Sequence, residues 1–232
     1  MNVFKTTLLA ASATLALSSG AMAQEPTKAL DISFNLGAAT DYVYHGVSQS
    51  DGNPQLSAGV DTTLWGVGYV GTWISRADFD NGTDAEYDLY VGARPQLGPV
   101  TLDLGVIYYG YVNQALGPKQ DFVVFKLGGT VPLGAATLGA EVHHSNDFFG
   151  QTGKATYVEL NGAMPVVEKF RVSGALGHQK VAYDGDYTTW NFGVSYAVND
   201  DVGLDLRYHD TDAHDLGDIY DGRVVLGVKA AF

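Results

Sequence analysis

The amino-acid sequence predicts an all-β protein, a transmembrane antiparallel up-and-down β-barrel of about twelve strands. Apolar and polar residues alternate with a period of two in one segment after another, which is the pattern of strands with one apolar face and one wet face. The breaks between these segments alternate between short and long, as they do in barrels that cross an outer membrane. No stretch after the N-terminal region stays apolar for the ~20 residues of a transmembrane helix, so a membrane-spanning chain of this kind must cross with strands.

The first 23 residues have the features of a secretory signal peptide that is cleaved. Lys5 supplies the positive charge, Leu8 to Leu17 the apolar region, and Ala21-Met22-Ala23 the small-residue cleavage site. Residues 24–232 are then expected to form one barrel domain. We expect this domain in the outer membrane of a Gram-negative bacterium, in contact with lipid and lipopolysaccharide.

Composition narrows the class of protein further. The chain holds 29 glycines and 14 tyrosines in 232 residues, a content that suits a curved sheet with aromatic belts better than a helical protein. It has no cysteine, so no disulfide framework is expected. The formal net charge of −13 argues against nucleic acid as a partner. We predict no cofactor.

The predicted strands follow one another from Leu30 to the last residue. In the first, alternation continues from Leu30 to about His45, which places Tyr42 and Tyr44 on the lipid face near a long loop. The second begins after Pro54. The strands after the first are expected at residues 56–64, 69–76, 86–94, 100–109, 122–131, 136–144, 156–164, 170–178, 188–198, 202–209 and 223–232.

The breaks between strands are of two kinds, which indicates the orientation of the barrel. The short ones lie at 66–68, 98–99, 132–134, 165–168 and 199–201, and the long polar ones at 46–53, 77–84, 113–120, 145–154, 181–186 and 210–221. Both chain ends then fall on the side of the short turns, which is the periplasmic side of such a barrel. Apolar aromatic residues near the strand ends are expected to form two interfacial belts.

The last strand carries a further indication. Val224, Leu226 and Val228 lie on one face and the chain stops at Phe232, at the length that a tilted strand needs to cross a bilayer. This resembles the closing strand of outer-membrane barrels, in which a terminal aromatic residue helps the barrel-assembly machinery to recognise its client. The resemblance implies that machinery as a partner.

Three stretches resemble the TorF family of porin-like outer-membrane proteins. They are Asp41-Tyr-Val-Tyr-His-Gly-Val-Ser-Gln-Ser-Asp-Gly-Asn-Pro54, Gly68-Tyr-Val-Gly-Thr-Trp-Ile-Ser75 and Glu86-Tyr-Asp-Leu-Tyr-Val-Gly92, with Tyr157-Val-Glu159 as a later element. The family commonly has arginine where this chain has His45, which would make a local charge dependent on pH. The resemblance covers essentially all of residues 24–232 and implies a porin-like barrel without a named solute.

Alternation also predicts which charges line the interior and which lie at its mouth. A barrel of about twelve strands leaves ~10 Å between its inner side chains, enough for ions or small hydrophilic solutes. Predicted to line the pore are Asp61, Asp88, Arg94, Asp103, Lys126, Glu141, Glu159, Arg171, Asp205, Arg207 and Arg223. The acidic mouth is predicted from Asp78, Asp80, Asp84, Asp184, Asp186, Asp210, Asp212 and Asp215. Such a mouth would favour cations, unless its carboxylates are simply solvated or bridged to lipopolysaccharide by divalent ions.

Two alternatives to an open pore remain at this point. The first is an interior plugged by its own salt bridges, in a barrel with a structural or adhesive role. The second is a lipid hydrolase, because His143-x-Ser145-Asn146 resembles a run in barrel phospholipases and lipid A deacylases. Alternation around Val142 places His143 and Ser145 in the lumen, away from bilayer lipid, unless a local bulge reverses the register. We therefore predict no catalytic residue, and no complete ligand set for a metal is found among the histidines.

Overall fold

The computed structural model describes residues 29–114 and 116–232. The predicted signal peptide, residues 1–23, lies outside the described residues. Twelve long strands form the barrel. They are β1 (Leu30–Ala39), β4 (Gln55–Leu64), β5 (Gly68–Arg76), β6 (Ala85–Ala93), β8 (Val100–Val112), β9 (Phe122–Leu133), β10 (Ala136–Ser145), β11 (Ala155–Val167), β12 (Phe170–Lys180), β13 (Tyr187–Ala197), β14 (Val202–Thr211) and β15 (Arg223–Ala231).

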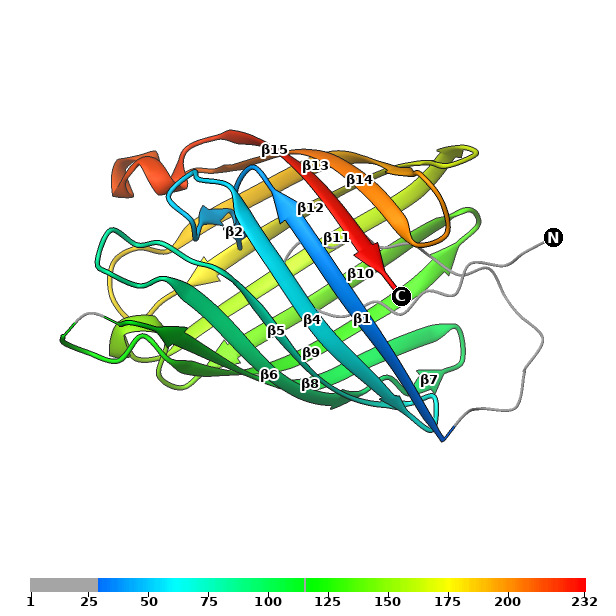
Figure 1. Cartoon of the computed structure of the whole chain (residues 1–232), viewed down its shortest axis with the longest axis horizontal. Helices are drawn as coiled ribbons and strands as arrows, with labels where there is room; N and C mark the ends of the chain where they lie inside the picture. Colours follow the sequence, from blue (N-terminus) through cyan, green and yellow to red (C-terminus); the bar gives the residue numbers. More distant parts are fainter. Residues whose placement is uncertain (1–28, 115) are drawn as a thin grey trace.

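These strands close into one antiparallel barrel, which confirms the predicted fold. Each long strand pairs with the next along the chain, and β1 pairs with β15 to complete the ring. Long loops gather at one end and short turns at the other, the left and right ends of Figure 1. A two-residue strand, β7 (Gln96–Leu97), extends one of the short turns. In the described residues, no helix is long and apolar enough to cross a membrane.

The predicted faces of the strands are also observed. On β15, Val224 and Leu226 are more than half exposed on the outer surface, whereas the side chain of Arg223 is 16 % exposed. Leu36 of β1 is 54 % exposed in the same way. Apolar side chains on the outside of a closed barrel are stable only against lipid, so this surface is the membrane-facing one.

Tyrosine rings that lie on glycines explain why the chain is rich in both residues. The ring of Tyr90 covers Gly71 of the neighbouring strand, where an added Cβ would lie 2.4 Å from a ring carbon. The ring of Tyr69 covers Gly92 in the same way, at 2.4 Å. Glycine lets the sheet bend and lets each ring lie flat on the backbone, which is how aromatic residues compensate for glycine in curved sheets.

One prediction about the first strand is wrong. β1 ends at Ala39 instead of continuing to His45, and the chain then turns into the barrel as a small hairpin of β2 (Val43–Tyr44) and β3 (Val47–Ser48). We call residues 41–50 the inner hairpin; its β2 strand is visible inside the barrel in Figure 1. Tyr42 and Tyr44 are 4 % and 8 % exposed, so they lie in the interior and not on the lipid face.

The local cause of this hairpin is its two-residue turn. His45 and Gly46 have φ angles of 48° and 86°, both in the left-handed region. Two consecutive positive φ angles define the type I′ turn that joins tightly paired strands. Glycine adopts this conformation freely and histidine does so more readily than most residues.

Candidate functional site

The barrel interior holds the predicted pore-lining charges, and several of them are joined into ion pairs along the wall. Arg94, the residue after β6, lies 3.2 Å from Asp103 of β8, and Lys126 of β9 lies 3.3 Å from the same carboxylate. Lys126 is also 3.4 Å from Glu141 of β10. This row crosses four neighbouring strands and alternates in sign, so it neutralises itself while its side chains stay 10–26 % exposed.

A second paired group lies on the other side of the interior. Arg207 of β14 binds Asp205 at 3.1 Å and donates hydrogen bonds to Asn191 and Ser173. Its five N–H donors are suited to such a fork of acceptors. Asp61, Glu159 and Arg171 also face the interior: Asn35 and Tyr90 donate to Asp61, Tyr157 and Asn161 donate to Glu159, and Arg171 is 9 % exposed.

The inner hairpin crosses the lumen above these groups. It leaves the wall between β1 and β4. β11 lies across the barrel from this point, with five strands between it and β4 on one side and four strands between it and β1 on the other. The ring of Tyr42 packs edge-on against Trp73 of β5, with centroids 5.3 Å apart, and that of Tyr44 lies 5.6 Å from Tyr109 of β8. The hairpin is therefore held against several walls of the barrel.

The tip of the inner hairpin reaches the far wall. The imidazole of His45 stacks on the ring of Tyr157 of β11 with centroids 3.5 Å apart, and its Nδ1 lies 3.2 Å from Oε1 of Gln179 on β12. Gly46 touches β13, since an added Cβ would lie 2.1 Å from Oγ1 of Thr189. In this conformation the hairpin spans the lumen from one side to the other.

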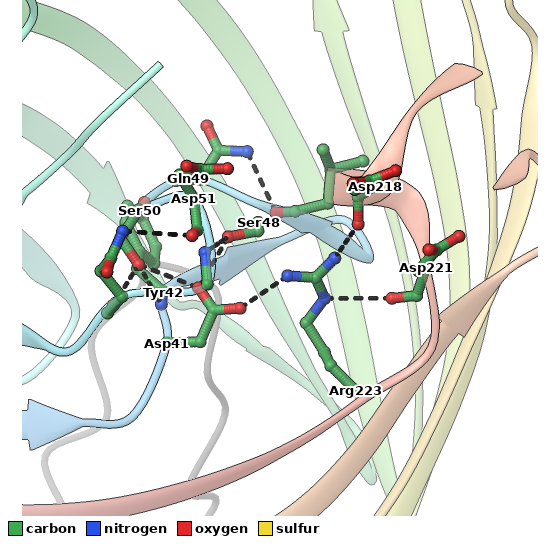
Figure 2. A network of polar contacts seen from close by, with 12 residues as sticks. Asp41, Tyr42, Ser48, Gln49, Ser50, Asp51, Asp218, Asp221 and Arg223 are labelled. Atoms are coloured by element: carbon green, nitrogen blue, oxygen red, sulfur yellow. Dashed lines mark hydrogen bonds and ion pairs between the residues drawn. The ribbon is translucent and has the colours of Figure 1, made fainter. Parts of the chain in front are cut away.

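The base of the inner hairpin is fixed by one ion pair. Asp41 accepts hydrogen bonds from Ser48 and Ser50 and from Nη1 of Arg223, at 2.7, 2.9 and 2.8 Å (Figure 2). Arg223, the first residue of β15, also donates to the carbonyl oxygens of Asp218 and Asp221 in the last long loop. A single guanidinium therefore ties the hairpin, the last loop and the barrel wall together.

An aromatic cluster fills the space around the hairpin. Its buried members are Tyr42, Tyr44, Tyr69, Tyr90, Ile107, Tyr109, Tyr111, Phe122 and Val124, and Phe79, Phe148 and Phe149 of the long loops pack against them. Val47 on the other side of the hairpin packs with Tyr187 and Ala213. Aromatic packing of this extent adds about 0.5–1.5 kcal/mol per ring pair beyond area burial. Side-chain packing therefore helps to hold the hairpin in the lumen, in addition to the contacts of its backbone.

The acids predicted at the mouth lie at the end of the long loops, with one difference. Asp78, Asp80, Asp84, Asp184, Asp186, Asp212 and Asp215 are partly or fully exposed. Asp210 belongs to β14 and is only 9 % exposed, because Tyr208 and His214 donate hydrogen bonds to its carboxylate at 2.7 and 2.8 Å. The hydrogen bond to the Asp210 carboxylate raises the pKa of His214, which lies in the long loop after β14.

His143 and Ser145 both face the interior, as their register requires. They are 9 % and 2 % exposed and line a small cavity with Tyr44, His45 and Gln179. Nε2 of His143 is 3.6 Å from Glu141, and Ser145 Oγ has no hydrogen-bond partner among the described residues. The cavity measures about 10 Å³, roughly the room of one water molecule.

Sequence reasoning missed Glu86 and the inner hairpin. Glu86 is 2 % exposed and accepts a hydrogen bond of 2.6 Å from Tyr42. Alternation already placed Glu86 on the same face as Asp88. The hairpin was signalled by His45-Gly46 between two β-prone pairs, Val43-Tyr44 and Val47-Ser48, which is the two-residue spacing of a tight turn.

The closed ring of twelve antiparallel strands, apolar outside and charged within, defines a β-barrel of the outer-membrane type. The chain belongs to the family described as "Bacterial protein of unknown function (Gcw_chp)", whose model matches residues 23–232. No curated protein matches the sequence.

Solved structures with the same fold are porins of low sequence identity. One described as "KdgM porin" has a TM-score of 0.63 at 8 % identity and covers 86 % of this chain and 99 % of its own. A "KdgM porin in complex with disordered oligogalacturonate" has a TM-score of 0.61 at 8 % identity, covering 87 % and 98 %. A "NanC porin" structure has a TM-score of 0.57 at 8 % identity, also covering 87 % and 98 %. At this identity the likeness concerns the fold.

Proposed function

We propose that this protein is an outer-membrane channel for the passive diffusion of ions or small hydrophilic solutes, with a preference for cations. The observation that carries the proposal is the position of the obstruction. The charged wall formed by Arg94, Asp103, Lys126 and Glu141 stays partly solvent-exposed, and the lumen is closed by a loop-borne hairpin and not by the wall itself. A loop-borne hairpin held by side-chain contacts can move without breaking the strand pairing of the wall.

Further support comes from chemistry and likeness. The exposed acids of the long loops would raise the local concentration of cations and lower that of anions. The porin fold of the solved structures and the resemblance of residues 41–54 to the TorF family agree with a channel. His143 and Ser145 face the interior, away from lipid substrates, which favours a channel over a hydrolase.

A closed barrel with a structural role is the second candidate, and the inner hairpin favours it. Single-channel recording in a planar bilayer with a KCl gradient separates the two. We expect the unmodified protein to open rarely, and Arg223→Gln to raise the open probability about tenfold or more, since it removes the ion pair to Asp41 and two hydrogen bonds.

The control is Lys154→Gln, which removes one exposed positive charge from the same end of the barrel. It should leave the open probability unchanged. A cation-favouring reversal potential is expected for every open channel. A folded barrel that stays silent in both variants would refute the channel and leave the structural role.

A further inference from the structure

Asp88 is a buried carboxyl group that the fold leaves without a partner. It lies in the middle of β6, is 0 % exposed, and neither of its oxygens has a hydrogen-bond partner among the described residues. Glu86, two residues away on the same face, is 2 % exposed. In the part of the chain that the structure describes, neither carboxyl group belongs to an ion pair, whereas Asp103, Glu141 and Asp205 of the interior each have Arg or Lys within 4 Å.

Burying a carboxyl group that has no hydrogen-bond partner is energetically unfavourable. A carboxyl group without a hydrogen bond loses its hydration and gains nothing in return. Orphaned polar groups in native proteins therefore point to a bound ion, a ligand or a catalytic role.

Aromatic rings flank Asp88. Trp73 of β5 and Tyr109 of β8 are its paired neighbours across the sheet, so their side chains flank it on the inner face. The inner hairpin places Tyr42 against Trp73 and Tyr44 against Tyr109, which roofs the carboxyl group with two more rings. Tyr42 also donates a hydrogen bond of 2.6 Å to Glu86.

We propose that Asp88, Glu86 and the rings of Trp73 and Tyr109 form a binding site for an organic ammonium ion, which becomes accessible when the inner hairpin withdraws. The inference rests on the proposed channel function and names the class of solute. Rings and a carboxylate are the groups that bind ammonium ions, through the negative faces of the rings and the charge of the acid. A metal ion is a poorer fit, because it needs more oxygen ligands than two carboxyl groups supply, and the described residues contain no group of three or more His, Cys, Asp or Glu arranged for one.

In the closed conformation, the two hairpin tyrosines occupy the place of the ligand. The solute and the hairpin then compete for one surface, so an ammonium ion favours the open conformation by mass action. This links recognition at Asp88 to opening, without a separate effector site.

A fluorescence titration tests the site independently of conductance. Trp73 is one of three tryptophans, so Trp65→Phe and Trp190→Phe leave it as the only indole reporter, next to Asp88. The Arg223→Gln change is added to release the hairpin. We expect tetramethylammonium chloride to change the Trp73 emission saturably, and sodium chloride at the same ionic strength to leave it unchanged.

Asp88→Asn, which keeps the shape and removes the charge, should weaken the affinity about tenfold or more. Glu86→Gln provides a second test of the site should the first variant fold poorly. The matched control is Asp205→Asn, an acid of the opposite wall that is paired with Arg207. Heat-modifiable migration in gels verifies that each variant is folded.

The outcomes separate the site from the channel. A saturable change that is lost in Asp88→Asn and kept in Asp205→Asn supports the site, whether or not the protein conducts. Absence of a saturable change, or an affinity that Asp88→Asn leaves intact, overturns the site even if single-channel steps are recorded. Binding without conductance would refute the channel and retain the site.

Discussion

At the scale of single residues, the interior divides into acids that are neutralised and acids that are not. Asp103 and Asp205 each have a basic partner within 3.3 Å, whereas Asp88 has none among the described residues. Ion pairs on a polar wall contribute little to stability individually but remove the cost of isolated charge. Asp88 therefore differs from Asp103 and Asp205 in having no basic group to offset its charge among the described residues.

The tip histidine should make closure depend on pH. Burial between Tyr44 and Tyr157, and then the proximity of His143, lower the pKa of His45 well below its usual range, while Glu141 and Gln179 act in the opposite direction. The released hairpin has an ordinary histidine pKa of about 6.5 and so binds more protons than the docked one. Docking is thus stable above this pH and weakens as the pH falls through it.

We expect the open probability to rise as the pH falls from about 7.5 to 5.5, and His45→Gln to flatten this profile. His178→Gln is the control, because His178 is exposed and its hydrogen-bond partner among the described residues is Thr188. A profile with the same slope in His45→Gln would assign the pH dependence to other groups.

At the scale of elements, the strands were predictable from sequence and the inner hairpin was not. Alternation located all twelve long strands because each has one face in lipid and one in water, so the two faces differ strongly in composition. The error arose where Tyr42 and Tyr44 continue the alternation of β1. Tyrosine suits a lipid interface and a buried aromatic cluster equally well. A tyrosine that continues the alternation of a strand therefore does not show in which of the two it lies.

The same ambiguity affects the site. Alternation correctly places Asp88 on the inner face, but pairing depends on which residues of other strands lie beside it. That information resides in the register between strands distant in sequence, such as Trp73 with Asp88 and Asp88 with Tyr109. No period within one strand contains it.

The hairpin tip gives a prediction at this scale. Gly46 lies against Thr189 and Thr211, so Gly46→Ala should prevent the tip from seating and leave the barrel intact. Chymotrypsin should then cleave after Tyr42 or Tyr44 at least about tenfold faster than in the unmodified protein, because local opening exposes a buried site.

Gly52→Ala is the matched control for that change. Gly52 also has a positive φ, of 68°, and lies in the same loop, but its nearest neighbour is the flexible end of Arg223 at 4.0 Å. It carries the same backbone strain without the clash. Equal cleavage of both variants would mean that strain, and not contact with the far wall, holds the hairpin.

At the scale of the whole molecule, the barrel depends on the seam between its first and last strands. β1 and β15 share five paired positions, from Asn35 with Ala231 to Ala39 with Gly227, whereas β1 and β4 share ten. Phe232 adds two backbone hydrogen bonds with Phe34, of 3.1 and 2.9 Å. This seam joins residues almost 200 positions apart in sequence, so its closure costs more chain entropy than any hairpin between neighbouring strands.

A disulfide across the seam should therefore stabilise the barrel. An added Cβ at Gly227 would lie 3.8 Å from the Cβ of Ala39, the mean separation in disulfides, and the chain has no other cysteine to compete. We expect Ala39→Cys with Gly227→Cys to form the bond on oxidation and to raise the stability by about 2–4 kcal/mol, seen as a higher temperature for the heat-induced gel shift. The reduced double variant and Ala39→Cys alone should unfold like the unmodified protein. Failure of the two thiols to join in the folded protein would mean that β1 and β15 do not meet in this register, and the closed ring on which both the channel and the ammonium site depend would have to be abandoned.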